Sequence, residues 1–334
     1  MPAVQHSPRR NDFRYRTAYV VQSITPFLPV PIFFLIRFFI MVAEAPTLCA
    51  LGCGTMGIAI LSGILDSLKD TTSADGASTP DGHKVNKPAR FLACIRSDKS
   101  LQKLEDLFEG EVACMKNKNV EAVKQSDIIL LGSKPQMCKE ILTASGMREA
   151  LEGKLLISIL AGTTLSQLRS WCPESTHVVR AMPNTPCKIR QGMTVLVCEE
   201  EITSDERSLV QWMFSQIGRA MFLEEKNIDA ATALCGSGPA FAAVFMEALA
   251  DGGVMMGLTR AAALELAAQT CQGTARMILD GQHPALIKDA VSTPGGCTIS
   301  GLLALEDGKI RSTVARTIQD ATERATALGK LSSK

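Results

Sequence analysis

The stretch that decides the fold is Thr47-Leu-Cys-Ala-Leu-Gly-Cys-Gly-Thr-Met-Gly57, followed by the apolar run Ile58–Leu65. An apolar run, a glycine-rich turn and a second apolar run predict a strand, a tight turn and a helix. Glycines let the backbone approach a pyrophosphate closely, and the N–H groups at a helix N-terminus attract its charge. We therefore expect a dinucleotide here, although a glycine turn without a ligand is the alternative. The contacts expected from this turn are Gly52, Gly54, Thr55, Met56 and Gly57.

Short apolar runs recur downstream and alternate with segments that are typical of helices. This alternation predicts an N-terminal Rossmann-type α/β domain, a doubly wound parallel sheet with helices on both faces. The runs expected to form its strands are 91–96, 111–115, 127–132, 155–160, 177–182 and 194–198. We place this domain at 46–202, with a flexible polar insert at 70–88.

From about residue 203 to 334 the pattern is helical, apart from a short expected strand at 220–223. Thr203 and Asp205 are candidate caps for the first helix. The segment Ala240–Met256 is apolar nearly all round, and its interruption by charged residues and glycines argues against a membrane span. A helix that is apolar all round is usually buried, and a small helical domain cannot bury several such helices alone. We therefore expect a subunit interface here, in an all-α C-terminal dimerisation domain. The expected helix breaks are 236–239, 257–259, 281–284 and 293–296.

Composition excludes several classes of function. The chain has 334 residues, a net charge of +1 and 5% aromatic residues, which gives no basis for a nucleic-acid partner. It has 11 cysteines without a CxxC pair, so no metal site is expected. Scattered cysteines in apolar runs indicate reduced, buried thiols, and we expect a cytoplasmic protein.

Residues 1–45 form an extension outside the expected domains. Residues 1–40 are rich in arginine and contain one acid, Asp12, as in a mitochondrial presequence. The stretch Ile24–Ala43 is apolar, but Pro26, Pro29 and Pro31 interrupt it, so a membrane anchor is disfavoured. A targeting segment, a membrane anchor and an over-extended gene model starting at Met41 remain as alternatives.

The end of the second expected strand indicates which cofactor binds. An NAD-binding domain usually carries Asp or Glu here, for the ribose 2′-hydroxyl. This chain has Arg96-Ser97-Asp98, and a guanidinium beside a hydroxyl suits the 2′-phosphate of NADPH. A shift of two residues would restore an acid, so Asp98 leaves NADH as the alternative.

Three further segments leave expected strands at the carboxyl edge, where ligands bind in such sheets. The segment Ser133-Lys134-Pro135 follows the fourth strand, and Ala161-Gly162 follows the fifth. Asn184 follows the sixth, and its amide fits either the nicotinamide or the turn itself. We count all six residues as candidate cofactor contacts.

Two signatures in the helical half concern the substrate. In Gly236-Ser237-Gly238-Pro239, Ser237 fits a helix N-cap and Pro239 the first helical position, so a substrate role for Ser237 competes with a structural one. In Val291–Gly301, hydroxyls and glycines precede a helix, an arrangement that binds a small carboxylate or simply caps the helix. The candidates in the second signature are Thr293, Gly295, Gly296, Cys297 and Thr298.

Taken together, these motifs resemble the pyrroline-5-carboxylate reductase family, and in particular its fungal members. They follow the family's order over about residues 46–330: Gly52–Gly57, Ser133–Pro135, Ala181–Pro186, Gly236–Ala240, Ala250–Val254 and Val291–Thr298. The resemblance implies NADPH-dependent reduction of L-1-pyrroline-5-carboxylate, a cyclic imine carboxylate, to L-proline. A protonated imine is already electrophilic, so positioning and electrostatics suffice for catalysis.

The resemblance also implies roles for individual residues. The Thr298 hydroxyl binds the ring nitrogen, and the backbone at Gly296–Thr298, with Thr293, holds the carboxylate. Asn119 matches a position near the adenosine phosphate. The substrate loop comes from the helical domain of the partner in a homodimer, and some relatives assemble into decamers. Thr293 stands where relatives carry Ser, and the hydroxyl is retained.

Two other functions remain to be weighed. A β-hydroxyacid dehydrogenase shares the glycine turn but uses a catalytic lysine, which the residues after Pro239 do not offer. A non-catalytic NADP-binding regulator would not need Thr298 or the Gly295-Gly296 pair, and both are present. None of the four histidines has a catalytic context, and His283, before Pro284, is expected to be structural.

Overall fold

The computed structural model describes residues 45–70 and 85–331. These described residues belong to one compact unit. The expected extension 1–45 and most of the expected insert 70–88 lie outside the described residues. Residues 85–88 do not behave as a loose insert: Val85 is buried in the core, and the Lys87 ammonium lies 5.3 Å from the centre of the Trp212 ring.

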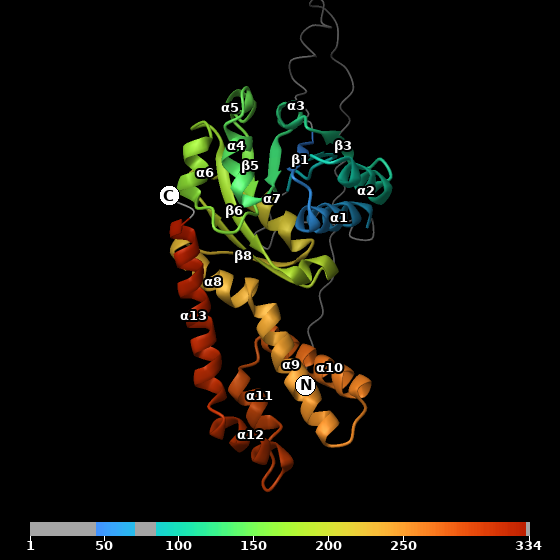
Figure 1. Cartoon of the computed structure of the whole chain (residues 1–334), viewed down its shortest axis with the longest axis vertical. Coiled ribbons are helices and arrows are strands. Elements are labelled where there is room, and N and C mark those ends of the chain that lie inside the picture. Colours follow the sequence, from blue (N-terminus) through green and yellow to red (C-terminus); the bar gives the residue numbers. More distant parts are fainter. Residues whose placement is uncertain (1–44, 71–84, 332–334) are drawn as a thin grey trace, which may run out of the picture. The chain divides into compact units, whose positions relative to one another are not determined.

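One eight-stranded sheet organises the first part of the chain, in the order β3-β2-β1-β4-β5-β6-β7-β8 (Figure 1). Its strands are β1 Thr47–Leu51, β2 Arg90–Ile95, β3 Ala113–Lys116, β4 Ile128–Leu131, β5 Leu155–Ser158, β6 His177–Pro183, β7 Gly192–Cys198 and β8 Gly218–Phe222. The first six strands are parallel, and the order reverses at β1, as expected for a doubly wound sheet.

The expectation of a wholly parallel sheet is wrong at β7, which runs antiparallel to β6. Only residues 184–191 connect the two strands, and they contain just the short helix η3 (Thr185–Ile189). A parallel connection needs a crossover of a dozen or more residues, so this link can only turn the chain back. Strand β8 is again parallel to β7.

Helices cover both faces of the sheet. They are α1 Thr55–Lys69, α2 Asp98–Phe108, α3 Asn119–Lys124, η2 Pro135–Met137, α4 Cys138–Leu142, α5 Met147–Ala150, α6 Leu165–Trp171 and α7 Ser204–Ser215. Strand residues alternate between two cores: Leu48 and Ala50 pack with α1 and α7, whereas Cys49 and Leu51 pack with α3 to α6. Both faces of β1 are therefore buried, which explains why its sequence is apolar throughout.

The sheet extends beyond residue 202, because α7 and β8 complete it. Helix α7 begins with a capping box in which the Thr203 hydroxyl accepts from Glu206 N and the Glu206 carboxylate accepts from Thr203 N. Thr203 is thus the cap, and Asp205 lies in the first turn. We therefore place the start of the helical part at Glu225.

The helical part consists of η4 Glu225–Asn227, α8 Ile228–Ala231, the π-helical turn η5 Thr232–Gly236, α9 Gly238–Met255, α10 Arg260–Leu279, α11 Pro284–Ala290, α12 Cys297–Asp307 and α13 Ile310–Leu331. The break expected at 236–239 is absent, because η5 leads directly into α9. Ser237 accordingly has helical dihedral angles and caps nothing with its side chain, contrary to expectation. His283 does cap α11, since its Nδ1 accepts from Ala285 N at 3.2 Å.

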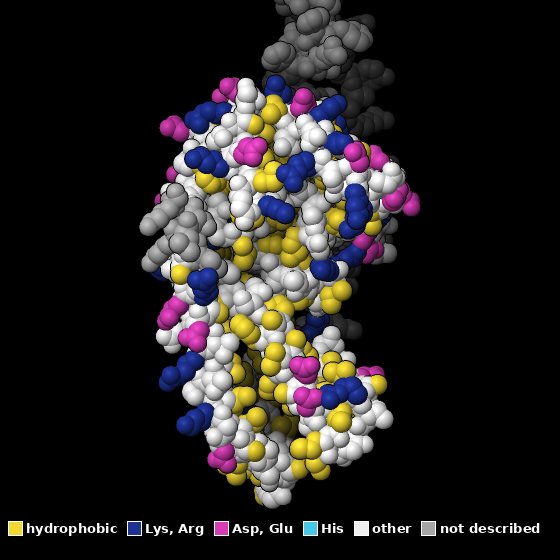
Figure 2. All heavy atoms as spheres, in the orientation of Figure 1, with side chains coloured by type: hydrophobic (Ala, Val, Ile, Leu, Met, Phe, Trp, Pro, Cys, Tyr) yellow, Lys and Arg dark blue, Asp and Glu magenta, His cyan; other side chains and the backbone are white. Residues whose placement is uncertain are grey.

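Apolar side chains remain exposed on the helical part, and Figure 2 shows them gathered over α9 to α12. In α9 only Ala250 is buried, and in α10 only Ala263 and Ala267. Among the described residues, the run Glu225–Met255 is long and apolar enough to cross a membrane. That is weak evidence, because an interface helix of a globular protein has the same length and composition.

Candidate active site

Two backbone segments meet at the glycine turn. Gly52 has φ +80°, and a Cβ there would lie 2.7 Å from Ser133 Cα, so only glycine fits. A Cβ at Gly54 would meet nothing within 4 Å, which leaves space above the turn. Gly54 is the N-cap of α1 and provides no side-chain cap, so the first-turn N–H groups of Thr55, Met56 and Gly57 face that space unpaired. This cradle fits the pyrophosphate of a dinucleotide.

A cleft of about 770 Å³ continues from the turn along the carboxyl ends of β1, β2, β3 and β4. It brings together seven of the predicted cofactor residues, which are Gly52, Gly54, Arg96, Ser97, Asn119, Ser133 and Lys134. Thr55, Met56 and Gly57 lie beside it in the first turn of α1, and Pro135 begins η2. These eleven predicted residues thus lie at the carboxyl edge of the sheet, where the sequence analysis expected them.

The end of β2 carries a cation without a carboxylate partner. The Arg96 guanidinium donates only to the Met137 Sδ, at 3.3 Å, and forms no ion pair with any described residue. Ser97 caps α2, where its hydroxyl accepts from Ser100 N at 3.2 Å and lies 2.9 Å from Ser100 Oγ. An unpaired guanidinium beside two hydroxyls suits a phosphate rather than a free ribose hydroxyl.

Asp98 does not restore the acid that an NAD site requires. It is the first residue of α2, and its Oδ1 lies 2.5 Å from the Lys116 Nζ at the end of β3. The lysine pairs with this exposed carboxylate, and Asp98 is not among the residues that line the cleft. The local charge therefore favours NADPH.

Several lining residues were not foreseen from the sequence. Ser100, Asn117 and Thr143 add polar groups to the cleft, and Met137 and Ile141 add an apolar wall. Asn117 was detectable in principle, because it follows β3 at the ligand edge and adopts φ +55°, a conformation that Asn tolerates. Cys53 also lines the cleft, but burial raises the pKa of its thiol to about 12, so it is not a thiolate at neutral pH.

Three predicted cofactor residues lie away from the cleft. Ala161 and Gly162 belong to the loop 159–164 between β5 and α6, where Gly162 has φ +77°. Asn184 follows β6, and its amide is engaged within the protein: Nδ2 donates to Cys235 O at 3.0 Å, and Oδ1 accepts from Met193 N at 2.9 Å. Asn184 therefore ties the sheet to η5, and its contact with the cofactor stays a prediction.

The second signature forms a compact turn between α11 and α12. Gly296 N donates to Thr293 O at 3.0 Å, Gly295 has φ +68°, and a Cβ on Gly296 would collide with the Thr293 hydroxyl. Gly296 is the N-cap of α12 and provides no side-chain cap, so the first N–H groups, including those of Cys297 and Thr298, stay open. No residue of this turn, and not Ser237 either, is among those lining the cofactor cleft.

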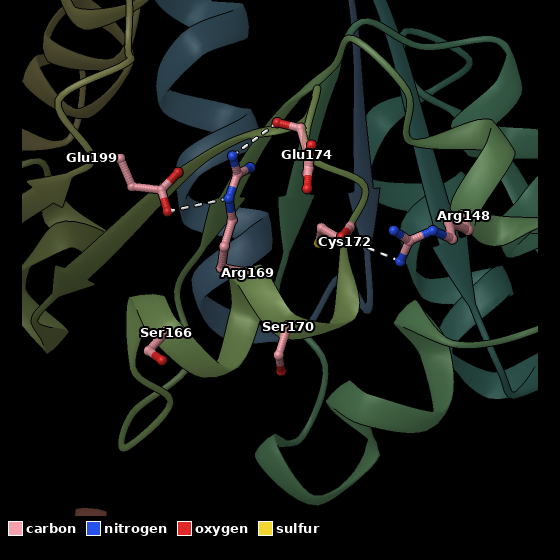
Figure 3. A pocket seen from close by; sticks show the side chains of 7 residues that line it. All are labelled: Arg148, Ser166, Arg169, Ser170, Cys172, Glu174 and Glu199. Carbon is pink, nitrogen blue, oxygen red and sulfur yellow. Dashed lines mark hydrogen bonds and ion pairs between the residues drawn. The ribbon is translucent and has the colours of Figure 1, made fainter.

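A second cavity, of about 820 Å³, is lined by residues of α5, of α6, of the turn before β6 and by Glu199 after β7 (Figure 3). Its two arginines are held by neighbouring groups. Arg169 donates to Glu174 O at 2.8 Å and pairs with Glu199 at 3.6 Å, while Arg148 donates to Cys172 O at 3.4 Å. These bonds fix the turn before β6, so the cavity offers little to a ligand.

Comparison with known proteins agrees with this geometry. The family described as pyrroline-5-carboxylate reductase dimerisation matches residues 225–328, and the one described as NADP oxidoreductase coenzyme F420-dependent matches residues 47–162. Among solved structures, a pyrroline-5-carboxylate reductase from Coxiella burnetii has a TM-score of 0.74 at 27% identity, over 85% of this chain and 99% of that one. Plasmodium falciparum pyrroline carboxylate reductase with NADP bound has a TM-score of 0.68 at 29% identity, over 86% and 99%.

Curated relatives are closer in sequence. Pyrroline-5-carboxylate reductase of Schizosaccharomyces pombe is 51% identical over 284 residues, which cover 84% of this chain and 99% of the relative. The enzyme of the same name from Neurospora crassa is 45% identical over 310 residues, covering 85% and 93%. The helical part that begins at Glu225 is the dimerisation domain of these proteins. The chain belongs to the pyrroline-5-carboxylate reductase family.

Proposed function

We propose that this chain reduces L-1-pyrroline-5-carboxylate to L-proline with NADPH, the last step of proline synthesis. The observation that carries the proposal is that one chain combines a cleft built for a phosphorylated dinucleotide with an uncapped helix start in a dimerisation domain. A relative named pyrroline-5-carboxylate reductase matches this chain over nearly its whole length, which supports the same activity here. A β-hydroxyacid dehydrogenase or a non-catalytic NADP-binding protein has no such support.

When bound in this cleft, NADPH would supply the hydride that reduces the imine carbon. The protein's own residues hold and orient the two reactants. The first-turn N–H groups of α1 receive the pyrophosphate, and Arg96 with Ser97 receives the 2′-phosphate. The open N–H groups at Gly296–Thr298 receive the substrate carboxylate, and the Thr298 hydroxyl bonds the ring nitrogen. Because hydride transfer needs a short, aligned approach, such positioning accounts for most of the rate.

The site requires a second copy of the chain. The signature turn does not line the cofactor cleft, and the helical part leaves apolar side chains exposed. We infer that the homodimer buries them and brings one chain's turn to the partner's cleft. The run Glu225–Met255 then packs against the partner instead of spanning a membrane. Assembly of dimers into a decamer and a cytoplasmic location stay predictions.

The decisive experiment follows NADPH oxidation with pyrroline-5-carboxylate for wild type and Thr298→Ala. We expect kcat to fall at least tenfold, since a hydrogen bond to the reacting nitrogen is lost, while the Kd for NADPH changes little. Thr317→Ala is the matched control, because that hydroxyl bonds only Thr313 O within α13, at 2.9 Å. Equal rates for wild type and Thr298→Ala would remove Thr298 from the mechanism, and an inactive wild type that binds NADPH would refute the proposed activity.

The cofactor choice is tested at Arg96. Losing a charge-assisted bond to phosphate costs about 1.5–3 kcal/mol, or roughly 10- to 100-fold in affinity. Arg96→Ala should therefore raise KM for NADPH by that factor and leave KM for NADH nearly unchanged. A parallel rise for both cofactors would show that Arg96 does not read the 2′-phosphate.

A further inference from the structure

A buried charge lies on β6, outside both signatures and outside the cofactor cleft. The Arg180 side chain is 6% exposed, and burial lowers its pKa although arginine stays charged at neutral pH. Two acids face it, both on the helical run Glu225–Met255. Glu225 Oε1 lies 3.4 Å from the guanidinium, and Asp229 lies one turn further along the run. A buried cation needs such partners, because removing them leaves an uncompensated charge.

The same oxygen of Glu225 also accepts a hydrogen bond from the backbone. Glu225 Oε1 accepts from Leu165 N at 2.8 Å, and Leu165 is the first residue of α6. The loop 159–164, which carries the predicted nicotinamide contacts Ala161 and Gly162, ends at that residue. One carboxylate therefore joins the end of this loop, the sheet and the start of the helical run.

Two more contacts fix the helical run to its surroundings. Asp229 Oδ2 accepts from the Thr326 hydroxyl of α13 at 2.7 Å. The Asn184 amide, just beyond β6, donates to Cys235 O in the π-helical turn η5. Arg180 of β6 and Asn184 just after β6 thus contact the two ends of the segment 225–235, shortly before α9.

We propose that buried Arg180 and half-buried Glu225 form a charge clamp that positions the loop 159–164 against the helical run Glu225–Met255 for hydride transfer. Both are positioning residues, since neither lies in the cofactor cleft. This inference rests on the proposed function in one respect: the position of the loop affects the rate only if the nicotinamide and the imine meet beside it. A displacement of about 1 Å is enough to cost up to 100-fold in rate.

The first test uses Glu225→Gln, which keeps an oxygen for Leu165 N but removes the charge that faces Arg180. We expect kcat to fall between about 10- and 100-fold, with the Kd for NADPH, read from its fluorescence, within about twofold of wild type. Glu225→Asp should recover part of kcat. The matched control is Glu111→Gln, which removes an exposed pair with Lys69 (2.8 Å) distant from the cleft, and it should keep wild-type kcat.

A second readout does not depend on activity. Hydrogen exchange at the Leu165 amide should be faster in Glu225→Ala than in wild type and Glu111→Gln, because its acceptor is gone. The double variant Arg180→Met/Glu225→Leu removes both charges, so it should fold as wild type does yet keep the low kcat. Wild-type kcat in Glu225→Gln, or recovery of kcat in the double variant, would overturn the clamp. Failure of the proposed function looks different, because wild type and Glu111→Gln would then both be inactive while the exchange result stands.

Discussion

The sheet and the helical part of this chain bury their apolar residues to very different degrees. Leu48, Leu130 and Leu131 in the strands are fully buried, whereas Val244 in α9 is 66% exposed and Leu303 in α12 is 61% exposed. The sheet has helices on both faces within one chain. The helices α9 to α12 lack such a cover and leave large apolar side chains exposed. The first region is a complete domain, and the second is half of an interface.

The candidate active site divides in the same way. The cofactor cleft is assembled from loops of one sheet, so a single chain suffices to form it. The turn Thr293–Thr298 leaves backbone N–H groups open at the start of α12 but does not line that cleft. Catalysis is therefore expected to depend on assembly, whereas cofactor binding is not.

The largest effect is expected when a charge is placed at an exposed apolar position of each region, because only the helical part should lose its partner. Val244→Glu should abolish the dimer and reduce activity at least 100-fold, because a carboxylate would be buried at the interface without a partner. Leu107→Glu is the matched control, since Leu107 in α2 is 49% exposed and we expect water to cover it. Light scattering after gel filtration and NADPH fluorescence check both variants. A dimeric, active Val244→Glu variant would move the interface elsewhere.

A matched leucine pair sharpens the same contrast. Leu130→Ala should lower the free energy of unfolding by about 2–5 kcal/mol at every protein concentration, because it opens a cavity in the sheet core. Leu303→Ala should lower Tm by an amount that grows on dilution, because its contacts lie in the partner. Thermal unfolding across a concentration series measures both. A concentration-independent loss for Leu303→Ala contradicts the proposed interface.

Acid stability should depend on the α7 cap of the sheet region. Burial raises the pKa of Glu206, but bonds from Thr203 and from His177 Nδ1 (2.8 Å) outweigh it and lower the pKa overall. A carboxyl with a lowered folded pKa stabilises the fold above its unfolded pKa, and this contribution fades as pH falls through the folded value. Glu206→Gln should therefore cost about 1 kcal/mol at pH 7 and less at pH 3. Urea unfolding at the two pH values tests this, and an equal cost at both would contradict it.

The smallest effect is expected at Lys87, shortly before β2. Lys87→Ala removes the contact with the Trp212 ring and should cost about 0.5 kcal/mol. Lys87→Arg should retain most of it, as read by urea unfolding. A loss above about 2 kcal/mol would show that residues 85–88 hold more of the structure than this contact.

The sequence by itself determined the strands, the glycine turn and the positions of the two signatures, 236–239 and 291–301. Hydrophobic periodicity, turn chemistry and motif order are all local properties of the sequence. It also placed Arg96 and Ser97 at the end of β2. Local pattern could not decide the direction of β7, since direction depends on the length of the link and on which edge is free. Nor could it show that a π-helical turn precedes Ser237 and leads into α9, or that the Asn184 amide binds Cys235 O in this turn.

Tertiary structure alone decided which charges meet. From the sequence, Asp98 leaves NADH as an alternative, but in the structure this first residue of α2 pairs with Lys116 at the end of β3. Arg180 and Glu225 are 45 residues apart, and nothing in their local sequence pairs them, yet folding places half-buried Glu225 against buried Arg180 at the junction of sheet and helices. Apolar periodicity specifies which face of an element is buried. The pairing of distant polar groups follows only once those faces have packed, because the energy of such a pair depends on its burial and geometry.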